Sequence, residues 1–251
     1  KPIRIHKARQ DFPELVVEPN QIMIFVARDI KIKLSTPFGT AMAGAEVEVG
    51  GDAVEIVEKA GKYTADSEGV IVIPYALLGY IEGAAFTPAK VSVKVATWKS
   101  MPIDYSVEKD AKEEIDIVVP KIGKLVVKVV GSRGQGIAGA DVTLKGVITL
   151  KGTTDESGVF ETEIVEGSWT VDVEKGGKKA STTATVSGGE VSEVELRLDI
   201  FMSVAGWDVS MSEFLGLIVL IIIIVIVLFI IAHEYSTWRT KRLMKVVKPA
   251  A

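Results

Sequence analysis

The chain of 251 residues contains no cysteine. This absence excludes disulfide bonds, a thiol nucleophile and cysteine-based zinc sites. Histidine is nearly as scarce, because His6 and His233 are the only two and lie far apart in the sequence. A serine triad needs a histidine base, and only His6 precedes the long apolar segment described below. We therefore predict that the protein is not an enzyme and has no catalytic, cofactor-binding or metal-binding residues.

Side-chain amides are also rare. Asn20 is the single asparagine, and the glutamines are Gln10, Gln21 and Gln135. Proteins of hyperthermophiles lose thermolabile amides and cysteine, so the composition predicts a thermophilic and archaeal source, with chance bias in a short chain as the alternative. Asn20 precedes Gln21 and Ile22, which excludes an N-glycosylation sequon. The net charge is −4, so the charge does not indicate binding to nucleic acid.

No signal peptide is present, and the chain begins at Lys1. An exported domain needs such a leader at some stage. We expect either that a leader was removed or that a longer surface protein precedes these residues.

One segment is long and uniformly apolar. From Phe214 to Ala232 there is no charged or strongly polar residue. As a helix this run covers about 28 Å, close to the hydrocarbon thickness of a bilayer. A buried strand of this length would be unusual. The segment is therefore predicted to be a single transmembrane helix.

The residues flanking this run predict its orientation. Ser210 and Glu213 have the spacing of a capping box. Aromatic and basic residues at the two ends are expected at the membrane interfaces: Trp207, Tyr235, Trp238, Arg239, Lys241 and Arg242. Because the basic residues follow the run, the positive-inside rule places the C-terminal tail in the cytoplasm and the N-terminal part outside the cell membrane. The tail serves as a stop-transfer signal or also contacts anionic lipids.

The preceding residues alternate between apolar and polar side chains, which is typical of half-buried strands. Strands are predicted at 30–34, 45–49, 91–95, 125–130, 169–173 and 191–198. Glycine pairs and clusters between them indicate turns. Helix signals are weak and limited to 75–80 and 110–114.

Two stretches repeat. Lys31 to Gly39, Ala43-Gly-Ala-Glu-Val47 and Asp66-Ser-Glu-Gly69 correspond to Val126 to Gly134, Ala138-Gly-Ala-Asp-Val142 and Asp155-Glu-Ser-Gly158. The spacing between the glycines is the same in both copies. The repeat predicts two copies of one β unit.

The second copy, from Leu125 to Leu198 and including Gly167-Ser-Trp-Thr-Val-Asp-Val173, resembles the carboxypeptidase regulatory-like domain, and the first matches it more loosely. That family implies a mainly β fold, with two tandem Ig-like or transthyretin-like β-sandwiches before the helix. The predicted divisions are an N-terminal segment (1–28), two sandwiches (29–119 and 120–200), a juxtamembrane linker (201–213), the transmembrane helix (214–232) and a basic tail (233–251).

Few residues suggest a site. An apolar insertion in the first copy is a candidate partner loop, containing Tyr75, Leu77, Leu78, Tyr80 and Ile81. The alternative is that it folds back onto the sandwich. Trp98 and Trp169 are interpreted as packing residues rather than sugar platforms, and the acidic turns at Asp66 and Asp155 as plain turns rather than calcium sites.

These features predict a non-enzymatic cell-surface structural or interaction protein, adhesin-like or a surface-layer-associated stalk. Its partners would be the lipid bilayer and other proteins. One alternative is an accessory single-pass subunit of a membrane enzyme, transporter or secretion complex. Another is the anchor end of a longer surface protein. Only Gly216 and Ala232 in the apolar run are small, which favours a lipid-facing helix over a packed one.

Overall fold

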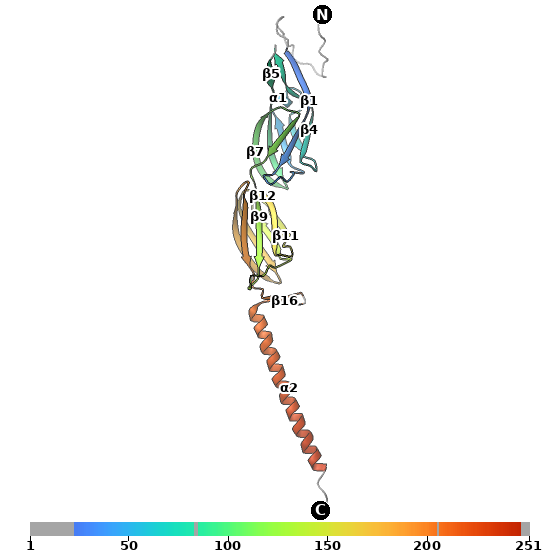
Figure 1. The fold of residues 1–251 in the computed structure, drawn as a ribbon, viewed down its shortest axis with the longest axis vertical. Coiled ribbons are helices and arrows are strands. Elements are labelled where there is room, and N and C mark those ends of the chain that lie inside the picture. Colours follow the sequence, from blue (N-terminus) through green and yellow to red (C-terminus); the bar gives the residue numbers. More distant parts are fainter. Residues whose placement is uncertain (1–22, 83–84, 205, 247–251) are drawn as a thin grey trace, which may run out of the picture. The chain divides into compact units, whose positions relative to one another are not determined.

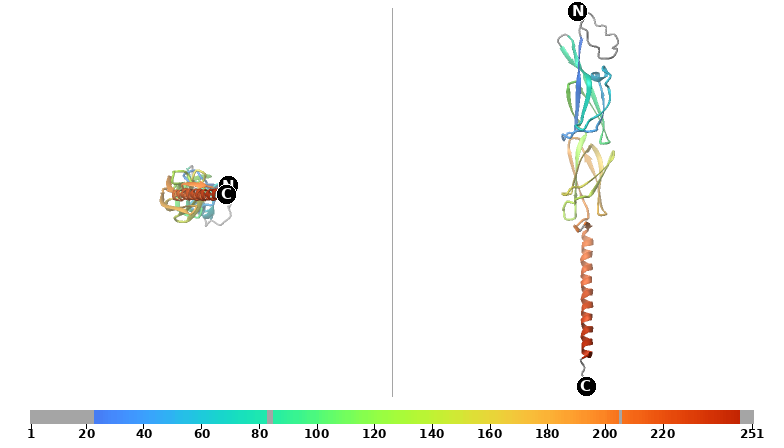
Figure 2. Two further views of the ribbon diagram at one scale, coloured as in Figure 1. Left: turned by 90° about the horizontal axis from the view of Figure 1, so that it is seen from below. Right: turned by 90° about the vertical axis from the view of Figure 1, so that its right-hand side faces the viewer.

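The computed structural model describes residues 23–82, 85–204 and 206–246, and the fold is mainly β with one long C-terminal helix (Figure 1). The chain divides into two compact units, Lys1–Gly123 and Lys124–Ala251. Most strands of each unit form two packed sheets, which we name sandwich 1 and sandwich 2 (Figure 2). The predicted fold class is confirmed.

Sandwich 1 is built from eight strands and one short helix. They are β1 (Met23–Ser35), β2 (Glu46–Gly50), α1 (Asp52–Glu55), β3 (Gly61–Thr64), β4 (Val70–Glu82), β5 (Ala85–Pro88), β6 (Lys90–Trp98), β7 (Met101–Asp110) and β8 (Glu114–Val118). One sheet has the order β5-β4-β1-β8 and the other β3-β2-β6-β7. The strands pair antiparallel except β1 and β8, which run parallel.

Sandwich 2 contains β9 (Ile122–Val130), β10 (Asp141–Lys145), β11 (Thr149–Thr153), β12 (Val159–Val165), β13 (Gly167–Lys175), β14 (Lys178–Val186) and β15 (Val191–Arg197). Its sheets have the orders β12-β9-β15 and β11-β10-β13-β14. A small hairpin of β16 (Met202–Val204) and β17 (Trp207–Val209) follows and leads into helix α2 (Met211–Val246).

The two sandwiches share one topology. In each, the first strand pairs in parallel with the last: β1 with β8, and β9 with β15. The four-stranded sheets β3-β2-β6-β7 and β11-β10-β13-β14 have equivalent orders. Among the described elements of sandwich 1, α1, β5, the start of β1 and the long second half of β4 have no counterpart in sandwich 2. The repeat predicted from the sequence is therefore a repeat of the fold.

Alternation along the strands supplies both cores. On β1, Ile30, Ile32 and Leu34 are fully buried while Lys31 and Lys33 are exposed. The equivalent residues of β9 are also fully buried, namely Leu125, Val127 and Val129. Burying each such side chain stabilises the fold by about 1.5–3 kcal/mol. The six predicted strands are all present.

The repeated turns have one construction. In sandwich 2, Asp155 Oδ1 accepts hydrogen bonds from the Ser157 and Val159 backbone N–H groups, both at 2.9 Å. Asp66 does the same in sandwich 1 for Glu68 and Val70, at 2.8 and 2.9 Å. These carboxylates order the backbone of a turn.

Gly158 of this turn has φ +82°. A Cβ placed there would lie 2.5 Å from Ile137 N and 2.6 Å from Val129 O. Gly69 makes the same close approach in sandwich 1, to Leu34 O at 2.6 Å. Glycine is thus required for two reasons: the backbone has a positive φ, and backbone atoms of neighbouring segments leave no room for a Cβ.

The two weak helix predictions are wrong. Residues 75–80 belong to β4, and residues 110–114 join the end of β7 to β8. Residues 76–80 pair with β1, while Asp110 pairs with β6 and Glu114 with β1, so sheet pairing overrides the local propensity of both segments. The only short helix of the described residues is α1, which the sequence analysis missed.

Candidate partner surface and apolar helix

The apolar insertion of sandwich 1 is not a loop, which corrects the sequence prediction. Residues Ala76–Glu82 continue β4 and pair with Met23–Arg28 of β1 on one side. On the other side Gly79–Glu82 pairs with β5. We name these three segments the ribbon. It extends the β1–β4 pair past the part of β1 that β8 covers, which begins at Lys31.

A bulge separates the ribbon from the sandwich. The β1–β4 register shifts between Arg28 and Ile30. Opposite this shift, Tyr75 has φ +56°, and its backbone N–H donates to Asp29 Oδ1 at 3.0 Å. A left-handed conformation is strained for a tyrosine, and the bulge turns its side chain outward, where it is 75% exposed.

The five predicted partner residues divide between core and surface. Leu77 is only 3% exposed and packs in the core, which agrees with the alternative that the insertion covers the sandwich. Leu78, Tyr80 and Ile81 are half-buried, and Tyr75 is exposed. A partner role for the exposed members stays a prediction.

Three further apolar residues of the ribbon are exposed and carry no local sequence signal of a site: Ile24 and Phe86 on one face, and Phe25 on the opposite face. Ile24, Ile81 and Phe86 lie opposite one another across β1, β4 and β5. The Phe86 ring covers Gly79, since a Cβ there would lie 2.7 Å from Phe86 Cζ.

Both long edges of the ribbon lack a neighbouring strand among the described residues. β5 is the outer strand of its sheet, and Met23–Arg28 pairs with β4 alone. Open strand edges present unpaired backbone donors and acceptors, which can accept a strand from another chain. The ribbon therefore combines exposed apolar side chains with a template for strand addition.

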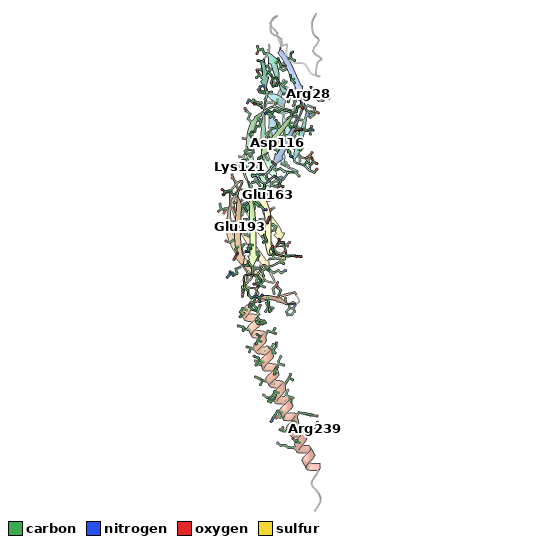
Figure 3. The ribbon with its side chains drawn as sticks, viewed as in Figure 1. Arg28, Asp116, Lys121, Glu163, Glu193 and Arg239 are labelled. Carbon is green, nitrogen blue, oxygen red and sulfur yellow. The ribbon has the colours of Figure 1, made fainter. Side chains whose placement is uncertain are left out.

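Helix α2 is the second candidate feature. It is the one helix of the described residues that is long and apolar enough to cross a membrane, over Met211–Lys241. From Leu215 to Ile231 its large apolar side chains are exposed, from 37% at Ile218 to 71% at Phe229, and side chains project from both sides of the helix in Figure 3. A helix that is apolar all round needs lipid or other helices around it.

The start of this helix has the predicted capping box. Glu213 Oε2 accepts the Ser210 backbone N–H at 2.7 Å, and Ser210 Oγ accepts the Glu213 N–H at 3.2 Å. Lys178 of β14 adds an ion pair to Glu213 at 2.9 Å. These contacts define where the helix begins and tie it to sandwich 2.

The predicted interface residues lie at the two ends of α2. Trp207 on β17 is 78% exposed. Beyond the apolar run, the rings of Tyr235 and Trp238 lie 6.2 Å apart. Arg239, labelled in Figure 3, is exposed further along. Lys241 is also exposed, and Arg242 belongs to the same helix.

The two candidate tryptophans are buried. Trp98 and Trp169 are each 1% exposed, and the Trp169 indole N–H donates to Val165 O at 3.0 Å. Both are core residues, as interpreted. His6 lies outside the described residues. Within the described part of the chain, no three His, Asp or Glu residues are grouped so that they could hold a metal ion.

No protein-family model matches the chain, and no curated protein matches it. Among solved structures it is similar to the Bacillus anthracis TIE protein, with 16% identity, TM-score 0.28, and coverage of 69% of this chain and 34% of that one. The chain thus spans about a third of that protein's length. It is also similar to GBS52, the minor pilin of Streptococcus agalactiae, with 12% identity, TM-score 0.30, and coverage of 68% and 95%.

A third similar structure is the shaft pilin SpaA of Lactobacillus rhamnosus GG, with 9% identity, TM-score 0.33, and coverage of 70% of this chain and all 100% of that chain. At such TM-scores the likenesses carry no argument about function.

Proposed function

We propose that the protein is a non-enzymatic surface protein, anchored by α2 in the cell membrane with its two sandwiches outside. The ribbon of sandwich 1 is its contact surface for another protein. The observation that carries the proposal is that one chain has both features. Its helix α2 is apolar on all sides, and its ribbon has open strand edges and a row of exposed apolar side chains. Ile24 is 50% exposed and Phe86 52%.

The partner that fits this ribbon is an extended segment of another protein. Such a segment adds backbone hydrogen bonds along an open edge, and its alternate side chains cover the apolar row. Exposed apolar side chains in register across three strands are costly in water unless something covers them. Adhesin-like and surface-layer-associated roles both belong to this class.

An accessory subunit of a membrane complex is the alternative. It would place other helices, rather than lipid, around α2. The scarcity of small residues in the apolar run favours lipid, since close helix packing uses small side chains.

The test is extraction in mild detergent, followed by size measurement and identification of co-purifying proteins. A surface partner held by the ribbon should be lost in an Ile24→Ser/Phe86→Ser variant and retained in Val147→Ser. Val147 is 60% exposed and lies in sandwich 2, so it is a matched control. Stable co-purification of a polytopic enzyme, unaffected by the ribbon variant, would instead support the subunit alternative.

The finer assignments are also proposals. Identity of the sandwiches as carboxypeptidase regulatory-like domains is supported by the shared Asp-x-x-Gly turn and by the Gly-x-Trp strand at Gly167. A thermophilic, archaeal source is supported by the amide-poor composition, and an unfolding midpoint above about 90 °C would agree with it.

A further inference from the structure

We propose that the end of sandwich 2 next to α2 is a binding surface for anionic phospholipid headgroups. In it Arg133 and Lys175 bind the headgroup phosphate, and Trp207 lies in the headgroup layer. The inference rests on the proposed membrane anchor and adds a specific lipid site to it.

The position of this surface relative to α2 is fixed by a chain of contacts. The turn 131–136 is bound to the segment before the hairpin, because Gln135 Nε2 donates to Ile200 O at 3.0 Å and to Phe201 O at 3.2 Å. The Ser132 N–H donates to the same Ile200 carbonyl at 2.9 Å. The Phe201 ring in turn packs on Phe214 in the first turn of α2, with centroids 5.3 Å apart.

These contacts place the surface at headgroup depth. The capping box starts α2 at Ser210, and the apolar run begins at Phe214, about 6 Å further along a helix. The headgroup layer on each side of the hydrocarbon is of similar thickness, about 5–8 Å. Residues that contact Phe201 or lie just before Ser210 therefore face headgroups.

A hollow of about 590 Å³ opens at this end of the sandwich. Its lining includes Arg133, Gln135, Lys175, Phe201, Ser203 and Asp208. It has room for a phosphate and its glycerol, and polar donors line it alongside the Phe201 ring.

The cations of the hollow are available to an anion. The Arg133 guanidinium lies over the Phe201 ring, 5.2 Å from its centroid. Lys175 Nζ donates one hydrogen bond, to Gly139 O at 3.0 Å, which leaves two further donors. Among the described residues neither forms an ion pair. A guanidinium over a ring still has N–H groups that can donate to phosphate oxygens.

Asp208 is the acidic member of the lining and already has partners. Its carboxylate accepts the Ser203 hydroxyl hydrogen bond. Its side chain also packs on Gly176, where an added Cβ would lie 2.8 Å from Oδ2. Lys178 and Glu213, on the same side of the sandwich, neutralise one another. The lining therefore carries two cationic side chains, Arg133 and Lys175, against the single carboxylate of Asp208, so its net charge is positive.

Trp207 completes the surface. It is 78% exposed on a hairpin three residues before the helix cap. An exposed indole is poorly placed in water but favoured in the headgroup layer, where its ring is apolar and its N–H finds an acceptor. The hairpin thus puts an interfacial anchor beside the two cations.

The test uses the full chain in nanodiscs, with Trp238→Phe as background so that Trp207 is the exposed indole. Nanodiscs contain phosphatidylcholine and phosphatidylglycerol, with bromine carried on the acyl chains of one lipid or the other. Brominated phosphatidylglycerol should quench the emission several-fold more than brominated phosphatidylcholine at equal fraction. Trp207→Phe should remove this difference.

The double variant Arg133→Gln/Lys175→Gln should abolish the stronger quenching by brominated phosphatidylglycerol. The control variant Lys62→Gln/Lys128→Gln, which removes two exposed lysines elsewhere, should retain this difference. Asp208→Asn should increase the difference. Equal quenching by the two lipids, or a preference that persists in Arg133→Gln/Lys175→Gln, would overturn the site while leaving the anchor intact. A chain that fails to enter nanodiscs would refute the anchor itself.

Discussion

The rings of Phe201 and Phe214 lie 5.3 Å apart and tilted by 33°, joining the last residues of sandwich 2 to the first turn of α2. An aromatic pair of this kind contributes about 0.5–1.5 kcal/mol beyond its buried area. A double-mutant cycle of Phe201→Ala and Phe214→Ala, followed by unfolding in detergent, should give a coupling free energy of that size. The control is the same cycle with Phe229→Ala in place of Phe214→Ala. Because Phe229 lies far along the helix from Phe201, the coupling free energy should be near zero.

Two glycine substitutions distinguish the cost of a positive φ from the cost of a close backbone approach in the turns. Gly158→Ala combines a left-handed backbone with backbone atoms within 3 Å of the new Cβ, so unfolding free energy should fall by about 2–5 kcal/mol. Gly134 has a similar φ of +79° but nothing within 4 Å. Gly134→Ala should therefore cost only about 1–2 kcal/mol. Equal losses in denaturant titrations would contradict the close approach seen at Gly158.

The Asp155 turn should make the stability of sandwich 2 depend on pH in acid. Hydrogen bonds from the Ser157 hydroxyl and the Val159 N–H hold the pKa of the Asp155 carboxyl below its ordinary value. A lowered folded-state pKa gives stabilisation that is present above about pH 4 and is lost as the pH falls through the lowered value.

In Asp155→Asn the unfolding midpoint of sandwich 2 should fall less steeply with acidification than in the unaltered protein. Glu156→Gln, a change at the exposed neighbour in the same turn, is the control and should retain the full slope. An unchanged slope in Asp155→Asn would show that other carboxyls set the acid response.

Leu77 and Tyr75 should respond in opposite directions, although both belong to the apolar insertion. Leu77→Ala empties a core position that is 3% exposed and should lower the unfolding free energy by about 2–5 kcal/mol. Tyr75→Gly relieves a left-handed residue and should raise it by about 1 kcal/mol. Calorimetry of both variants checks this, and a destabilised Tyr75→Gly would show that the ring packs more than its exposure suggests.

The sequence predicted strands and repeats well because period-two burial dominates them. Ile30, Ile32 and Leu34 alternate with lysines, and each Asp-x-x-Gly turn depends on contacts within a few residues. The sequence-based prediction is wrong for residues 75–80, because a run of apolar residues beside a proline carries no periodicity. Only pairing with β1 and β5 decides that it is a strand, and the bulge at Tyr75 then decides which side chains are buried.

The candidate surface was predicted in part for the same reason. Apolar character alone is enough to predict Tyr80 and Ile81 as candidates. Ile24 and Phe86 join them only through register across three strands, which no local pattern shows. The capping box at Ser210 and Glu213 was predictable because it is formed within one helical turn.

The central claim is that α2 crosses the cell membrane with the sandwiches outside, and the absence of cysteine makes it directly measurable. Single cysteines at Ser187 and Thr240, both exposed positions on opposite sides of the apolar run, can be labelled in intact cells with a membrane-impermeant maleimide. The account predicts that Ser187→Cys is labelled at once and Thr240→Cys only after the membrane is permeabilised. Labelling of Thr240→Cys in intact cells, with Ser187→Cys protected, would contradict it.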